Sequence, residues 1–318
     1  MTAIEVKPLR EDLSFGARIR GVSFDTLKDE SVRKQIRATF EERGMIVFED
    51  VEPDSYLQVE LSETLGPLKD HPLGEVARAH SDLAPGVIEL RHKPENAAIV
   101  EIDGMRVSEW LPWHFDHCYN NELNRAGVLR AVEIPAELGF TRFADGIQMY
   151  NDLSPALRKE IEGRNILYSL DMRFEYMRFG KPENLVEITK KKIIYDLLEK
   201  VNSLPRAVHP AVWTRESGEK VLHISPWMAL GIEGHEDAEG DALLTAVCDE
   251  MIANMTVYEH HWRPTDMLTW DNWRLLHSVT GCDPKYSRCM HRTTIRGDYG
   301  LGYFENNGTG DKILEMTV

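Results

Sequence analysis

The sequence predicts a mainly β fold, either a barrel or a sandwich, with helices packed on one side. Strand-like segments are numerous and short, and turn residues separate them. Segments with helical spacing cluster near the start of the chain and in insertions between strands. A doubly wound α/β sheet is disfavoured, and the chain has no GxGxxG or GxxxxGK motif for a nucleotide.

The first expected elements are two strands and two helices. Residues 16–24 (GARIRGVSF) alternate as a strand does, and residues 45–50 (MIVFED) are rich in β-forming side chains. Residues 29–44 (DESVRKQIRATFEERG) have apolar side chains at helical spacing and end in glycine. Residues 52–66 (EPDSYLQVELSETLG) are helical in the same way.

Short strands recur along the rest of the chain, and they are expected at residues 87–92, 127–135, 207–214, 220–226, 266–272 and 292–297. Two short helices are expected within residues 141–163, the second capped by Ser154 before Pro155, and a longer helix within residues 236–255. Residues 169–204 are mixed and charged, and we expect an insertion or lid over one face that ends in a helix.

Length and composition limit the class of protein. Without a repeat or low-complexity linker, we expect one domain spanning residues 1–318. The net charge of −16 disfavours a nucleic-acid partner, which needs a basic face. Four cysteines without a CxxC pair and a start without an apolar signal segment favour a cytoplasmic protein. The apolar runs are too short for a membrane span, so no membrane partner is expected.

Residues 111–117, LPWHFDH, hold two histidines and an aspartate within four positions. If this run is a strand or a strand end, His114 and Asp116 point to one face and offer an imidazole and a carboxylate to a divalent metal. His117 would point the other way, as a surface residue or a neighbour of the ligands. The triplet alone is weak evidence, because a single histidine or aspartate is more often structural.

A third ligand is offered far along the chain, in residues 269–281 (TWDNWRLLHSVTG). His277 in this segment would complete a set of three ligands that leaves three positions open on iron. Arg288 follows 11 residues later, and Arg292 shares its parity, so a strand would aim both guanidinium groups to one side. Because arginine binds carboxylates through two parallel hydrogen bonds, the pair suits a dicarboxylate beside the metal.

These motifs resemble the taurine dioxygenase/2,4-dichlorophenoxyacetate dioxygenase (TauD/TfdA) family of Fe(II)- and 2-oxoglutarate-dependent oxygenases. The similarity covers most of the chain and is carried by GARIRGVSFD, RGMIVFED, LGPLKDHP, WHFD, the Thr141 segment, HPAVW, and WDNWRLLH followed by SRCMHRTTIRGD. Its most specific part is the composite of WHxD, WDNxxxxH and RxxxR. The resemblance implies a double-stranded β-helix, a cupin-like jelly roll with helical insertions.

The resemblance also implies the roles of the metal and co-substrate residues. His114, Asp116 and His277 would bind Fe(II), and 2-oxoglutarate and O2 would take the open positions. Arg288 and Thr141 would hold the distal carboxylate of 2-oxoglutarate. Related halogenases have a small residue where Asp116 stands, so its carboxylate favours oxygenation. The implied products are succinate, CO2 and a substrate oxidised at a C–H bond by hydroxylation, with desaturation or cleavage left open.

The substrate is less defined by the sequence. Arg292 matches an arginine near the other co-substrate carboxylate and the substrate's anionic group, which favours a small anionic substrate. His71 matches an anion-binding histidine of sulfonate-oxidising members, and a plain loop histidine beside Pro72 is the alternative. Aromatic and polar side chains that could line a larger or more aromatic pocket, or simply pack in the core, are Trp110, Trp113, His223, Trp227 and Met228. Members of the family usually form dimers or tetramers, so a homo-oligomer is expected.

Two other classes of protein remain open. A cupin-type hydrolase or isomerase could use the same three ligands, but it has no need of Arg288 and Thr141 as a dicarboxylate clamp. A non-catalytic metal-binding protein with a degenerate site is disfavoured by the intact ligand set and both arginines.

Overall fold

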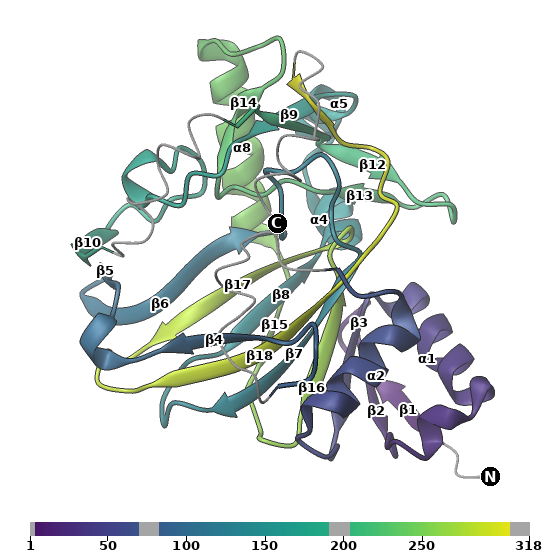
Figure 1. Ribbon diagram of the computed structural model, residues 1–318. Helices are drawn as coiled ribbons and strands as arrows, with labels where there is room; N and C mark the ends of the chain where they lie inside the picture. The colour runs from purple at the N-terminus through teal and green to yellow at the C-terminus, as the bar shows by residue number, and fades with distance from the viewer. Residues whose placement is uncertain (1–3, 70–82, 191–203, 306–318) are drawn as a thin grey trace.

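Two facing sheets form the centre of the protein, whose computed structural model describes residues 4–69, 83–190 and 204–305 (Figure 1). The larger sheet has seven strands, in the order β1 (Glu5–Pro8), β2 (Ala17–Arg20), β3 (Met45–Glu49), β16 (Met267–Asp271), β7 (Ala126–Glu133), β18 (Arg288–Ile295) and β4 (Ile88–His92). The smaller sheet has six, in the order β10 (Val186–Thr189), β5 (Ile99–Ile102), β6 (Met105–His114), β17 (Leu275–Cys282), β8 (Thr141–Asp145) and β15 (Val257–His260). The described pairings in both are antiparallel except that of β2 with β3. The predicted double-stranded β-helix is confirmed.

Further strands and helices surround these sheets. A four-stranded sheet has the order β14 (Ala229–Ile232), β9 (Asn165–Tyr168), β11 (Ala207–Pro210) and β19 (Tyr303–Phe304), and β12 (Val212–Thr214) pairs with β13 (Lys220–Leu222). The α-helices are α1 (Glu30–Arg43), α2 (Ser55–Leu65), α4 (Gly146–Asp152), α5 (Pro155–Ile161) and α8 (Ala238–Asn254). Short 3-10 helices are η1 (Thr26–Lys28), η2 (Pro94–Asn96) and η3 (Phe174–Tyr176).

The helix ends follow from capping residues in the sequence. The Asp29 side chain accepts a hydrogen bond from the backbone N–H of Ser31 at the start of α1, and Gly44 ends the helix at φ 70°. Ser154 does stand at the N-cap of α5, as predicted, but its side chain makes no capping hydrogen bond. Pro155 at the first turn of α5 instead favours the helical start through its fixed φ.

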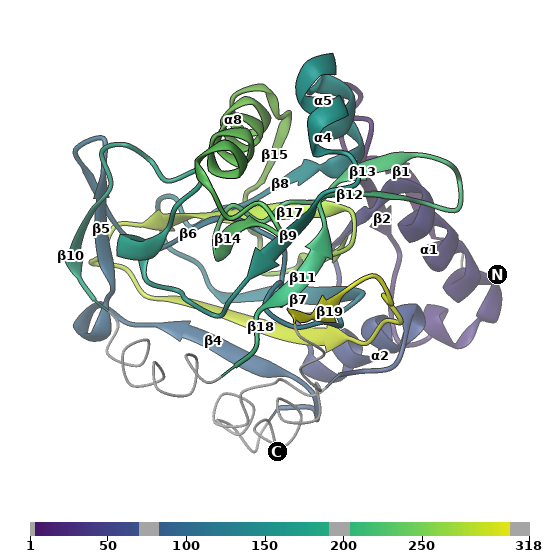
Figure 2. The ribbon, with the colours of Figure 1, turned by 90° about the horizontal axis from the view of Figure 1, so that it is seen from above.

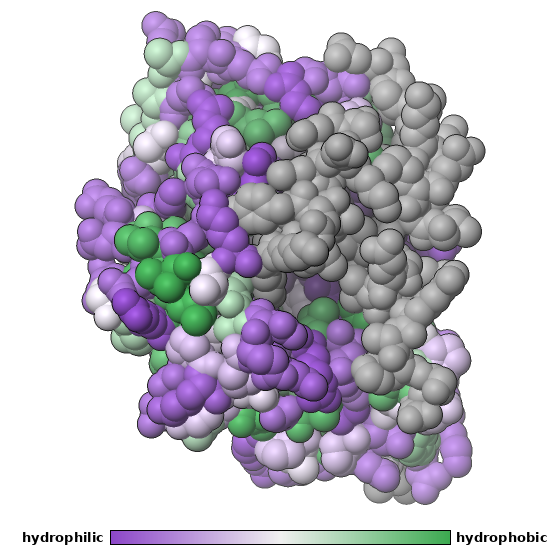
Figure 3. Space-filling view, turned by 60° about the vertical axis from the view of Figure 1, so that its left-hand side comes forward, coloured by the Kyte–Doolittle hydropathy of each residue, from purple (hydrophilic) through white to green (hydrophobic). Residues whose placement is uncertain are grey.

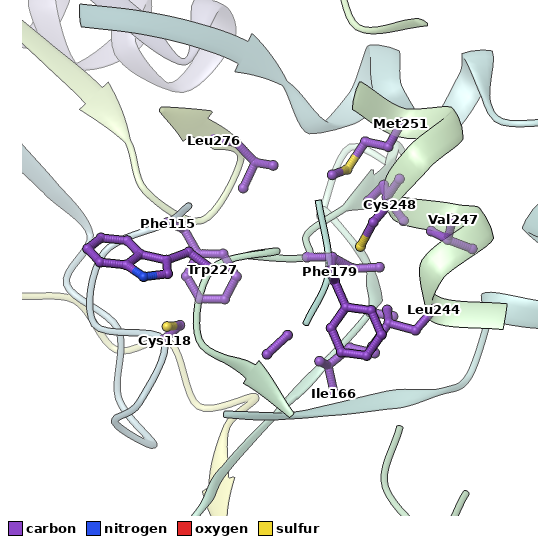
Figure 4. Close-up of a cluster of buried hydrophobic side chains, with 14 of the residues drawn as sticks. Phe115, Cys118, Ile166, Phe179, Trp227, Leu244, Val247, Cys248, Met251 and Leu276 are labelled. Atoms are coloured by element: carbon purple, nitrogen blue, oxygen red, sulfur yellow. The ribbon is translucent and has the colours of Figure 1, made fainter. Parts of the chain in front are cut away.

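Three clusters of buried apolar side chains hold these layers together. One lies between the two large sheets and includes Leu129, Phe143, Leu268, Trp270, Leu275 and Met290. A second joins the outer face of the seven-stranded sheet to α1 and α2, which pack against each other at one side of the molecule (Figure 2). The third packs the outer face of the six-stranded sheet against α8, and Figure 4 shows part of it, including Phe115, Trp227, Leu244, Val247, Met251 and Leu276.

The segment expected to be an insertion begins beside the six-stranded sheet. Within it, η3 is followed by β10, which pairs with β5 and extends that sheet at its edge. The predicted helix near its end falls on residues 191–203, which lie outside the described residues. The described residues visible on the face in Figure 3 are mostly hydrophilic, with a compact apolar patch among them. A search of the described residues finds no helix with the length and hydropathy needed for a membrane span.

Two fully buried histidines, His209 and His223, lie in the core next to the outer face of the six-stranded sheet. Each ring donates from Nε2 to a backbone carbonyl oxygen, of Cys118 at 3.0 Å and of Asn272 at 2.9 Å respectively. Burial lowers the pKa of His209 to about 4 and that of His223 to about 3. Both rings are therefore neutral at neutral pH.

We expect the free energy of unfolding to fall as the pH drops below about 6.5. Below that pH the two histidines bind protons in the unfolded chain but stay neutral in the folded protein. The decrease in the free energy of unfolding that His209 causes reaches about 3 kcal/mol near pH 4, where the folded protein also begins to bind the proton. Urea unfolding from pH 7 to pH 4 measures it. His209→Gln should flatten the profile, whereas His261→Gln, at a side chain that is 66% exposed, should not. Equal slopes for His209→Gln and the wild type would contradict this prediction.

Candidate metal centre

Two histidines meet where neighbouring strands of the six-stranded sheet pair. His114 is the last residue of β6, and His277 of β17 is its partner in the register. Their ring centroids are 4.1 Å apart. His114 Nδ1 lies 2.8 Å from the Pro112 carbonyl oxygen, and because a carbonyl only accepts, Nδ1 carries the hydrogen. The lone pair of His114 therefore lies on Nε2, where a metal can take it.

Asp116 reaches the same place from a turn, because β6 ends two residues earlier. The Asn272 side chain holds this turn by bonding both backbone groups of Asp116. Its Oδ1 accepts from the Asp116 backbone N–H at 2.8 Å, and its Nδ2 donates to the Asp116 carbonyl at 3.1 Å. Nδ2 also lies 3.2 Å from the Asn124 carbonyl oxygen. Asn272 was not predicted as a site residue, although it stands in the WDN motif.

The three donor atoms form a compact, buried set. Asp116 Oδ1 lies 3.7 Å from His277 Nε2 and 4.0 Å from His114 Nε2. All three donors lie within 4.8 Å of one another, and each residue is less than 9% exposed. Two imidazoles and one carboxylate are the ligands of non-haem Fe(II) sites that keep open positions. The donor set thus fits such a metal.

Electrostatics puts these ligands in the protonation states that a metal needs. Burial lowers the pKa of His114 and of His277, so both rings are neutral. Burial alone would raise the pKa of Asp116, but the charge of the Arg292 guanidinium outweighs it and holds that pKa below its usual range. The site therefore offers two neutral rings and one carboxylate near neutral pH.

Arg288 and Arg292 both lie on β18 of the facing sheet, as the shared parity predicted. Arg292 donates to both oxygens of Asp116, at 2.6 Å from Nη2 to Oδ2 and 3.2 Å from Nη1 to Oδ1. Arg288 is buried and donates from Nε to the Gly139 carbonyl oxygen at 3.3 Å. Among the described residues no carboxylate lies within ion-pair distance of Arg288, although the charge of Glu109 acts on it from farther away and favours its charged form. Because burial lowers its pKa, an arriving carboxylate would stabilise its charge.

Thr141 begins β8, two residues after Gly139, and is buried. Its hydroxyl oxygen accepts a hydrogen bond from Trp262 Nε1 at 3.1 Å. A hydroxyl can accept and donate at once, so the hydroxyl hydrogen is left to donate. No acceptor for it occurs in the described part of the chain. Thr141 and Arg288 are therefore two buried donors that the protein itself leaves partly unused.

An aromatic group lies beside the histidines. The ring of Trp227 is edge-on to that of His114, with centroids 5.3 Å apart. Phe174 lies 6.1 Å from Trp227 and 5.2 Å from Trp110, so the three rings are continuous. Trp227 belongs to the same buried cluster as Phe115, and Figure 4 draws both toward one end of it. Phe174 was not predicted individually, because the sequence only marked residues 169–204 as a segment over one face.

The remaining predicted residues lie elsewhere. Trp113 lies under Arg142, 5.2 Å from its guanidinium carbon, and packs on the outer core. His223 stacks on Phe115 at 3.9 Å, and Met228 is buried in the same core. His117 is buried, so of the two expected roles, a surface residue or a neighbour of the ligands, only the second fits its position. His71 lies outside the described residues.

A second group of possible metal ligands, Glu89, Cys289 and His291, lies on β4 and β18. Arg91 donates to both oxygens of Glu89, at 2.7 and 3.1 Å. Arg130 Nη2 lies 2.7 Å from His291 Nδ1, so that nitrogen accepts. The two guanidinium groups would repel a metal cation, and they already bond the Glu89 carboxylate and the His291 ring that would have to bind it. We therefore interpret this group as an ion-pair network.

Comparison with known proteins identifies the class of this protein. A model of the family described as "Taurine catabolism dioxygenase TauD, TfdA family" matches residues 5–294, and the chain belongs to that family. It is 27% identical over 297 residues to an (S)-phenoxypropionate/alpha-ketoglutarate-dioxygenase of Sphingobium herbicidovorans, covering 93% of this chain and 96% of that protein. It is 23% identical to an alpha-ketoglutarate-dependent sulfate ester dioxygenase of Pseudomonas putida, covering 90% and 88%.

Solved structures share the fold. A taurine dioxygenase from Burkholderia xenovorans superimposes with a TM-score of 0.64 at 23% identity, covering 96% of this chain and 94% of that one. The complex of AAD-2 with Mn(II) and N-oxalylglycine superimposes with a TM-score of 0.69 at 20% identity, covering 93% and 98%. The protein is a 2-oxoglutarate-dependent dioxygenase, a class that uses Fe(II), 2-oxoglutarate and O2.

We expect Asn272→Ala to lower the free energy of unfolding by about 2 to 4 kcal/mol, because buried backbone groups of Asp116 and Asn124 lose their partner. It should also weaken Mn(II) binding by roughly 10-fold, since the turn that carries a ligand is released. Denaturant unfolding and Mn(II) titration measure the two effects. Asn184→Ala, at an exposed asparagine, is the control. An Asn272→Ala protein that matches the wild type in both would contradict the prediction.

Proposed function

We propose that His114, Asp116 and His277 hold Fe(II), and that Arg288 and Thr141 bind the distal carboxylate of 2-oxoglutarate. One observation carries the proposal. The six-stranded sheet brings together two neutral imidazoles and one carboxylate, and β18 of the facing sheet carries a buried arginine, Arg288, with no described carboxylate within ion-pair distance. A metal hydrolase or isomerase would have no use for that arginine. A dicarboxylate co-substrate would supply a carboxylate within hydrogen-bond distance of that arginine.

The residues of the chain would orient and shield the reaction. Bound iron would let O2 oxidise both molecules, so that one oxygen atom enters succinate as 2-oxoglutarate loses CO2 and the other enters a C–H bond of the substrate. His114 keeps its Nε2 lone pair for the metal, because the Pro112 carbonyl fixes its tautomer, and His277 would offer its own Nε2. Arg288 would fix the co-substrate through its carboxylate. Trp227 would exclude water beside His114.

We further propose that the substrate is a small organic anion whose apolar part packs against Trp110, Phe174 and Trp227. The relatives named for phenoxypropionate and sulfate esters support an anionic substrate. The continuous rings next to His114 support an apolar or aromatic body. Trp113, His223 and His71 stay secondary candidates for contact with the substrate. Arg292 and His71 are candidates for contact with its anionic group.

The organisation of the whole protein is also proposed. One domain spans residues 1–318, and residues 169–190, the first part of the expected insertion at 169–204, cover the substrate side, which the contacts of Phe174 support. The four cysteines are unpaired, which is consistent with the cytoplasm. A homo-oligomer, a dimer or tetramer, is expected from the family.

The proposed ligand set has a direct spectroscopic test. Anaerobic addition of Fe(II) and 2-oxoglutarate should produce a weak visible absorption band, because the 2-oxo acid chelates the metal. His114→Ala should abolish the band, and His261→Ala, at an exposed histidine, should preserve it. If the wild-type protein gave no band, or His114→Ala gave the same band, the assignment of the metal site would be wrong.

The aromatic wall makes a separate prediction about substrates. Phe174→Ala should lower kcat/KM for an aryloxyalkanoate by roughly 10-fold or more, since an aromatic contact is worth about 1 kcal/mol beyond its buried area. Tyr176→Ala is the matched control, because Tyr176 belongs to the same 3-10 helix but is 58% exposed. Succinate release measures both. Equal losses for the two variants would remove Phe174 from the substrate site.

A further inference from the structure

The two oxygens of Asp116 have different surroundings. Oδ1 faces the imidazoles, at 3.7 Å from His277 Nε2 and 4.0 Å from His114 Nε2. Oδ2 accepts from Arg292 Nη2 at 2.6 Å, the shorter of the two bonds that Arg292 makes to this carboxylate. Charge-assisted bonds of this length are the strong ones in proteins. Oδ1 is thus turned to the two imidazoles and accepts only the longer bond from Arg292, at 3.2 Å, whereas Oδ2 accepts the shorter one.

Arg292 is itself fixed in place. It lies in the middle of β18, paired on one side with β4 and on the other with β7. Its guanidinium carbon lies 5.4 Å from the ring centroid of Trp270, and its side chain is only 14% exposed. Because the backbone of Asp116 is held by Asn272, the carboxylate is fixed at both ends. Neither partner can rotate freely.

We propose that Arg292 is a positioning residue that withholds Oδ2, so that Asp116 offers only Oδ1 to the metal. This inference rests on the proposed function, in which the metal must keep three positions for the 2-oxo acid and O2. A carboxylate that bound through both oxygens would take a fourth protein position and leave two. Arg292 therefore protects the open position that O2 requires. Its role as an anion contact becomes secondary.

The number of water molecules on bound Mn(II), in the absence of 2-oxoglutarate, tests this proposal. Water-proton relaxation and pulsed EPR in isotopically labelled water count them. The wild type should carry three waters, and Arg292→Met, which has no donor for Oδ2, should carry two. The relaxation enhancement should then fall by about one third. Arg292→Lys keeps a charged donor and should keep three waters.

Arg288→Met is the matched control, because it makes the same change on the same face of β18 without a bond to Asp116. It should keep three waters. Three waters on Mn(II) in Arg292→Met would overturn the proposal. Two waters in the wild type would also overturn it, and that measurement does not depend on the folding of any variant. If the wild type bound no Mn(II), the proposed function itself would fail, so the two failures are distinguishable.

Discussion

The ion pair between Asp116 and Arg292 joins the two facing sheets at the point where the metal ligands meet. Asp116 follows β6 of the six-stranded sheet, and Arg292 lies on β18 of the seven-stranded sheet. The bond therefore fixes the distance between the sheets at the site. It also lowers the pKa of Asp116 against the effect of burial. A charge that would be costly in an apolar interior becomes a stable ligand.

The turn between β16 and β17 holds Asp116 in position, because it carries Asn272. Arg274 donates to both oxygens of Asp145, each at 2.8 Å, and Arg125 forms an ion pair with Asp271. These bonds hold the turn that carries Asn272, which in turn holds Asp116. Both pairs are largely buried, so the loss of one partner would leave an uncompensated charge. The WDNWR motif is thus mainly a scaffold for the ligands.

Local patterns predicted most of the elements, and together with the family resemblance they marked three candidate ligands that the structure brings together. Strand alternation and capping residues located α1, β3, α2 and β18, because these signals depend on neighbouring residues alone. The pairing of β6 with β17 could be expected only through the family resemblance, since it joins residues more than 150 positions apart. The roles of Asn272 and Phe174 could not be predicted, because they arise from contacts across the fold. Likewise, parity placed Arg292 beside the site but could not show that Asp116 is its partner.

The most direct test of this account is an experimental structure with Mn(II) and 2-oxoglutarate bound in the absence of O2. One metal ion should lie on His114 Nε2, His277 Nε2 and Asp116 Oδ1. Asp116 Oδ2 should stay on Arg292, and Arg288 should pair with the distal carboxylate. A metal bound elsewhere, or an Asp116 bound to the metal through both oxygens, would contradict it.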